Sequence, residues 1–167
     1  MSHVGENKVQ EARDKKPLVR GSARWHLIGH LQSNKAKDAV KLFDVIETID
    51  SADLAAKVAR AAGAAGKRQE VLLQVNIGRE PQKSGAEPDD AESLALEIRR
   101  METLRLRGLM AIPPEGESRP HFRALRELRD RLGLEALSMG MSADYEAAIE
   151  EGATIVRVGS AIFGSRG

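Results

Sequence analysis

The chain has 167 residues, a length that suits one domain with a sizeable core. Its 26 Lys and Arg residues against 25 Asp and Glu leave a formal net charge of +1, so no bulk attraction to nucleic acid or membrane is expected. The absence of cysteine excludes disulfides and thiolate metal sites, and no apolar run approaches the roughly 18 residues of a membrane span. These features predict a soluble, cytoplasmic protein.

Short β-branched segments alternate along the chain with longer amphipathic ones. The expected strands cover residues 25–29, 43–49, 71–77, 106–112, 137–141 and 154–158. The expected helices cover residues 6–15, 34–42, a segment that follows the N-cap Ser51, and residues 89–101, 121–132 and 143–151. At the start of the chain, residues 2–4 form at most a remnant of a strand.

Six strand–helix units in succession, with strands apolar on both faces, predict a parallel sheet covered by helices. A TIM-type (β/α)8 barrel is favoured over an open doubly wound sheet, because no G-x-G-x-x-G follows the first strand. A closed barrel needs eight strands, so we expect a single domain over residues 1–167 that is incomplete at its N-terminus.

Polar residues stand where strands run into helices, the place where parallel barrels carry their chemistry. Arg157 interrupts an apolar strand that ends in the turn Gly159-Ser160, and Ser142 follows the preceding strand. A buried guanidinium beside hydroxyls and backbone N–H groups suits a small phosphorylated ligand. Two plainer interpretations stay open: Ser142 as an ordinary helix N-cap, and Arg157 as one half of a structural ion pair.

His26, in the first expected strand, and His30, directly after it, are four residues apart. On a strand this spacing separates their Cα atoms by roughly 13 Å, so a shared metal ion is not expected.

Taken together, several segments resemble the pyridoxal phosphate homeostasis proteins (YggS/PROSC type), which have the fold-type III barrel of the alanine racemase N-terminal domain. The matching segments are residues 5–11, 25–35, 74–77, 83–85, 107–113, 137–142 and 156–164. They follow the family's order and cover essentially the whole chain.

The resemblance implies a cofactor, pyridoxal 5'-phosphate, and a role for each strand-end residue. Arg157 would face the pyridine nitrogen and keep it unprotonated, which blunts the electron sink of amino-acid chemistry. The phosphate would be held by Ser142, Gly159 and Ser160. The ring would be lined by Asn7, His26 and Met110. The implied function is intracellular binding and carriage of the cofactor without turnover, with no catalytic residue and no metal.

The chain departs from the family pattern near its start. Family members carry an N-terminal strand whose lysine forms the Schiff base, whereas here Gly5-Glu6-Asn7 stands almost at the beginning. We therefore expect non-covalent binding at best, and possible self-association through exposed sheet edges. The alternatives are a fold-type III enzyme such as an amino-acid racemase, and a TIM-barrel enzyme acting on an unrelated sugar phosphate.

Overall fold

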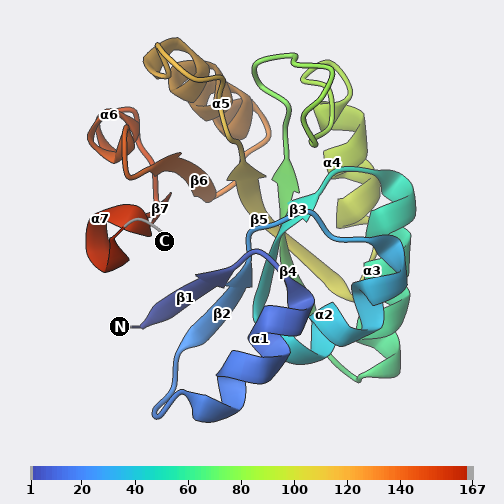
Figure 1. The fold of residues 1–167 in the computed structure, drawn as a ribbon. Helices are drawn as coiled ribbons and strands as arrows, with labels where there is room; N and C mark the ends of the chain where they lie inside the picture. Colours follow the sequence, from blue (N-terminus) through green and yellow to red (C-terminus); the bar gives the residue numbers. More distant parts are fainter. Residues whose placement is uncertain (1, 165–167) are drawn as a thin grey trace.

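A computed structural model describes residues 2–164, in which seven β-strands alternate with helices (Figure 1). The strands are β1 (His3–Glu6), β2 (Arg24–Leu27), β3 (Val45–Ile49), β4 (Gln69–Gln74), β5 (Leu104–Met110), β6 (Ala136–Met141) and β7 (Ile155–Arg157). The α-helices are α1 (Val9–Lys15), α2 (Ala36–Leu42), α3 (Ala52–Ala64), α4 (Ala91–Arg99), α5 (Arg119–Arg131), α6 (Tyr145–Glu150) and α7 (Ser160–Phe163). Two 3-10 turns, η1 (Lys16–Leu18) and η2 (Ser33–Lys35), complete the elements.

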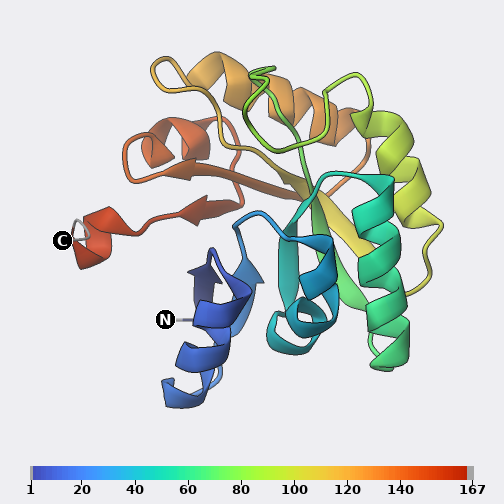
Figure 2. The same cartoon turned by 45° about the vertical axis from the view of Figure 1, so that its right-hand side comes forward.

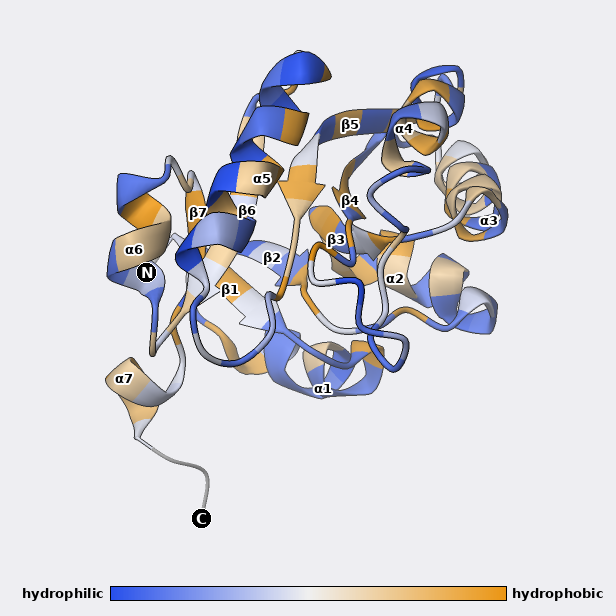
Figure 3. Cartoon of the chain, turned by 90° about the horizontal axis from the view of Figure 1, so that it is seen from above, coloured by the Kyte–Doolittle hydropathy of each residue, from blue (hydrophilic) through white to orange (hydrophobic). Residues whose placement is uncertain are grey.

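All seven strands are parallel, and their order in the sheet follows the chain from β1 to β7. Each strand therefore returns through a helix to the side of its predecessor, which curls the sheet into a nearly closed barrel. Seen from above, the strands occupy the centre and the helices surround them (Figure 3). Among the described strands, β1 and β7 each pair on one side only and form the two edges, seen together beside the chain ends in Figure 2.

Side chains alternate between the two faces of the strands and build two apolar clusters. The larger lies between the outer face of the sheet and the helices, and it includes Ile46, Leu73 and Leu109. The smaller cluster consists of four buried residues from neighbouring strands, Val45, Leu72, Met110 and Ala136. Because the second set alternates with the first along each strand, it fills the inside of the barrel.

The predicted fold class, a TIM-type barrel with helices outside parallel strands, is confirmed. The cap of α3 is also confirmed, since Ser51 Oγ accepts a hydrogen bond from the backbone N–H of Leu54 at 3.2 Å. No helix within residues 2–164 is both long enough and apolar enough to span a membrane.

The start of the chain differs from the prediction. Glu6 does not begin a helix but ends β1, whose four residues pair with β2, and α1 begins only at Val9. The remnant strand is thus a full seventh strand. Backbone pairing with β2 outweighs the local helical preference here, and the Glu6 carboxylate reaches α1 instead through an ion pair with Lys15 at 2.9 Å.

Candidate functional site

The carboxyl end of β7 leads into a turn that meets the end of β6. Arg157 is the last residue of β7, and Gly159 precedes α7. The hydroxyl of Ser142, in the loop after β6, accepts a hydrogen bond from the backbone N–H of Ala161 at 3.3 Å. Ser142 and the Gly159-Ser160 turn therefore share one corner, which offers hydroxyls and backbone N–H groups of the kind that bind phosphate.

Ser142 does not cap α6, so the interpretation as an ordinary N-cap is wrong. The helix begins only at Tyr145, and Asp144 occupies the position before it. A turn closed by two hydrogen bonds between Met141 and Asp144 follows β6: the Asp144 carboxylate accepts the Met141 N–H at 2.8 Å, and the Asp144 N–H bonds back to the Met141 carbonyl at 3.0 Å. This turn delays the helix and leaves the Ser142 hydroxyl facing α7.

The guanidinium of Arg157 lies on the inner face of the barrel. It donates hydrogen bonds to Ser138 Oγ at 2.6 Å and to the carbonyl of Ala111 at 2.9 Å. Burial lowers the pKa of Arg157, while the carboxylates of Glu47 and Asp144 act in the opposite direction. Arg157 pairs directly with no carboxylate of residues 2–164, so the alternative of a structural ion pair is not what the geometry shows.

Two residues that sequence reasoning missed, Glu47 and Ser138, connect Arg157 to the opposite side of the barrel. Ser138 Oγ donates to Glu47 Oε2 at 2.5 Å, and Glu47 Oε1 lies 2.7 Å from His26 Nδ1. Both Glu47 and Ser138 are fully buried. One signal for Glu47 was available, because an acid at the centre of the apolar run of residues 45–49 needs a partner inside the fold.

The other expected ring-lining residues lie at different places around the barrel. His26 faces inward from β2 and is hydrogen-bonded to Glu47, while Met110 is fully buried in the inner apolar cluster. Asn7 is exposed and follows β1, the edge strand at the other end of the strand order from β7. Its backbone packs closely on Gly29, where a Cβ atom would lie 2.1 Å from the Asn7 carbonyl oxygen. The structure joins His26 to Arg157 through hydrogen bonds that pass through Glu47 and Ser138, and Asn7 follows the carboxyl end of β1 outside this hydrogen-bonded chain.

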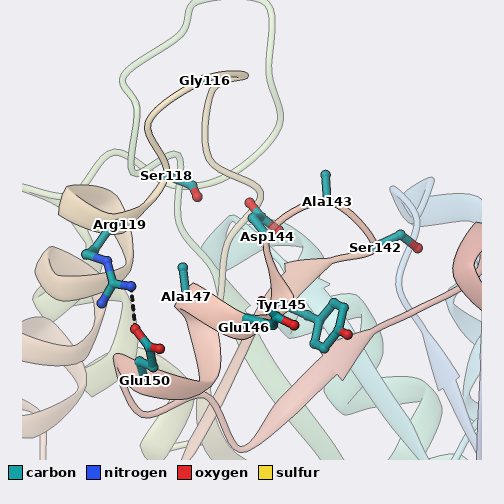
Figure 4. A pocket seen from close by; sticks show the side chains of 10 residues that line it. All are labelled: Gly116, Ser118, Arg119, Ser142, Ala143, Asp144, Tyr145, Glu146, Ala147 and Glu150. Atoms are coloured by element: carbon teal, nitrogen blue, oxygen red, sulfur yellow. Dashed lines mark hydrogen bonds and ion pairs between the residues drawn. The ribbon is translucent and has the colours of Figure 1, made fainter.

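A surface pocket of about 610 Å³ adjoins this corner, between the loops that follow β5 and β6 (Figure 4). Its lining residues are Gly116, Ser118, Arg119, Ser142, Ala143, Asp144, Tyr145, Glu146, Ala147 and Glu150. The Arg119 guanidinium is engaged by the Glu150 carboxylate, as the dashed line in Figure 4 marks. Within residues 2–164, no group of three or more His, Cys, Asp or Glu side chains is placed to hold a metal ion.

Comparison with known proteins identifies the family of this chain. A profile described as "Alanine racemase, N-terminal domain" matches residues 1–167. The "Pyridoxal phosphate homeostasis protein" of Aquifex aeolicus is 43% identical over 173 residues, which cover 97% of this chain and 76% of the relative. The protein of that name from Escherichia coli is 41% identical over 175 residues, covering 97% of this chain and 75% of the relative. This chain belongs to the pyridoxal phosphate homeostasis protein family.

Solved structures agree with this family membership. PipY of Synechococcus elongatus, solved with pyridoxal phosphate (PLP) bound, matches with a TM-score of 0.92 at 38% identity, covering 98% of this chain and 82% of PipY. An alanine racemase of Clostridium difficile matches with a TM-score of 0.82 at 15% identity, covering 99% of this chain and 46% of the racemase. The likeness to the racemase shows a shared barrel fold.

Proposed function

We propose that this chain binds pyridoxal 5'-phosphate non-covalently and serves in its homeostasis as a carrier, without turnover. The observation that carries the proposal is the partly buried guanidinium of Arg157 on the inner face of the barrel, one short turn from the corner made by Ser142 and Gly159. A cation inside the barrel and phosphate donors at its rim suit the two ends of a phosphorylated pyridine ring.

The residues present fit this cofactor. The Nε2 atom of His26 and the side-chain oxygen of Gln74 are buried and find no hydrogen-bond partner in the described part of the chain, as expected where a polar ligand completes the site. Ser142, Gly159 and Ser160 would hold the phosphate, Arg157 would face the ring nitrogen, and the ring would be lined by Asn7, His26 and Met110. When bound, the cofactor supplies an aldehyde and an electron-withdrawing ring.

The absence of turnover is supported by how the inner face uses its ionisable groups. Glu47 and one nitrogen of His26 are hydrogen-bonded to each other in a chain that continues through Ser138 to Arg157. A permanent cation at the ring nitrogen would keep that nitrogen unprotonated and weaken carbanion stabilisation. The names of the relatives point the same way.

The setting that we infer is cytoplasmic, with a small phosphorylated molecule as the principal partner and neither nucleic acid nor membrane. The lack of cysteine fits a reducing compartment. Self-association is also proposed, because β1 and β7 each present one unpaired edge in the described structure. Light scattering across a concentration series measures it, and a constant monomer mass would refute it.

The experiment compares pyridoxal 5'-phosphate with pyridoxal, which lacks the phosphate, by equilibrium dialysis. We expect saturable binding of the phosphorylated form and binding about tenfold weaker or more for pyridoxal. Ser142→Ala should weaken binding of the phosphorylated form only, and Ser93→Ala, on the exposed surface of α4, is the matched control. Equal affinity for both compounds would refute the phosphate corner, and conversion of L-alanine to D-alanine by the loaded protein would refute the absence of turnover.

A further inference from the structure

One buried nitrogen on the inner face of the barrel has no hydrogen-bond partner among residues 2–164. The His26 side chain is about nine-tenths buried, and its Nδ1 atom lies 2.7 Å from Glu47 Oε1. Its other nitrogen, Nε2, is buried and makes no hydrogen bond. The ring of His3, from β1, packs edge-on against the His26 ring with 5.2 Å between centroids. Because buried polar atoms are nearly always paired, this nitrogen points to a missing ligand atom.

The hydrogen-bond directions around Glu47 determine which nitrogen of His26 carries the proton. An ionised carboxylate only accepts hydrogen bonds, so the atom facing Glu47 Oε1 must be a protonated Nδ1. On the other side, Glu47 Oε2 accepts from Ser138, whose oxygen accepts from Arg157. Both oxygens of the Glu47 carboxylate therefore accept a hydrogen bond, one from His26 and one from Ser138. When Nδ1 carries the only ring proton of His26, Nε2 presents a bare lone pair.

We propose that Glu47 is a positioning residue of this site: it orients His26 so that Nε2 accepts a hydrogen bond from a ring hydroxyl of the ligand. The ligand class is a phosphorylated 3-hydroxypyridine, an identity that rests on the proposed function. The fully buried Glu47 carboxylate, on β3, is held by two short contacts, to His26 on β2 and to Ser138 on β6, and Ser138 in turn accepts a hydrogen bond from Arg157 on β7. It acts only through the imidazole of His26.

The first test needs no ligand. The ¹⁵N chemical shifts of the imidazole of His26, in histidine-labelled protein and assigned with His26→Gln, report which nitrogen is protonated. We expect a protonated Nδ1 and a bare Nε2 in the unmodified protein, and loss of that single form in Glu47→Gln. Glu70→Gln, which removes a carboxylate on β4 paired with Arg24 at 2.7 Å, should leave the shifts unchanged. A proton on Nε2, or on both nitrogens, would overturn the proposal.

The second test compares pyridoxine 5'-phosphate with its 3-deoxy analogue, which lacks the ring hydroxyl. In Glu47→Gln we expect affinity for the first to fall by about tenfold and affinity for the analogue to stay unchanged. Ser138→Ala, which removes one partner of Glu47 and keeps the carboxylate, should show a smaller loss in the same direction. Near-UV circular dichroism checks that each variant is folded.

The two tests separate this inference from the proposed function. If pyridoxine 5'-phosphate binds, and Glu47→Gln has the same affinity as the unmodified protein for each compound, the role of Glu47 is refuted and the cofactor-binding function stands. If neither compound binds while His26 is protonated on Nδ1, the proposed function fails and the orienting of His26 by Glu47 stands.

Discussion

Replacement of Arg157 by Ala should weaken binding of pyridoxal 5'-phosphate far more than binding of inorganic phosphate. Two of the five N–H donors of Arg157 are committed, to Ser138 Oγ at 2.6 Å and to the Ala111 carbonyl at 2.9 Å. We assign one remaining donor to the ring nitrogen. A hydrogen bond to a charged group contributes about 1.5–3 kcal/mol, so the loss for the cofactor is expected to be about tenfold to a hundredfold.

Inorganic phosphate reports only on the corner formed by Ser142 and Gly159. Its affinity for Arg157→Ala should fall by less than about threefold, because the Arg157 guanidinium acts on inorganic phosphate only through a screened charge. Competition dialysis against each ligand measures both losses in the same protein. Arg157→Lys is the matched control for charge, since it keeps the cation and lacks the planar fork, and we expect it to recover phosphate binding but little of the ring preference. Equal losses for both ligands in Arg157→Ala would refute the assignment of this residue to the ring.

Three further predictions concern stability and labelling. Ser51→Ala should destabilise the fold by about 1 kcal/mol, and Ser51→Gly by less, because the N-cap hydrogen bond to Leu54 is lost. Urea unfolding measures the loss, with Ser93→Ala as the control. Equal stability of Ser51→Ala and the unmodified protein would show that the cap does not stabilise the fold. Hydrogen bonding from Arg123, supported by Arg126 and Arg119, lowers the pKa of the buried Glu151. The ionised Glu151 carboxylate therefore stabilises the folded protein above its unfolded-state pKa, and this stabilisation is lost as the pH falls through its folded-state pKa. Glu151→Gln should therefore be less stable than the unmodified protein at pH 7, and this difference should disappear as the pH falls through the lowered folded-state pKa of Glu151. Glu92→Gln, on the exposed surface of α4, should show neither effect. Borohydride treatment after incubation with the cofactor should label no single lysine stoichiometrically, because no strand within residues 2–164 contains a lysine. Stoichiometric labelling of Lys35 or Lys83 in peptide maps would contradict non-covalent binding.

Local sequence signals were sufficient where a residue's role depends on its immediate neighbours. The alternation of short apolar segments with amphipathic ones predicted the parallel barrel, because strands covered on both faces need helices around them. Ser51 predicted its own cap, and Arg157 with Ser142 marked two adjacent strand ends. The prediction was wrong where local and long-range preferences conflict, because Glu6 belongs to β1 and not to a helix, and the alternative interpretation of Ser142 as the cap of α6 also failed.

The amino-acid sequence by itself determined the barrel class and which polar residues follow the strands, since apolar strand segments, amphipathic helix segments and strand-end residues are properties of short segments. Only the tertiary structure brought Glu47 to Ser138, 91 residues away along the chain, and placed His26 against the same carboxylate. No local pattern encodes such a contact, because the curl of the sheet sets which inward-facing residues meet across the barrel. The unpartnered nitrogen of His26 became visible for the same reason, as a consequence of burial that the fold imposes.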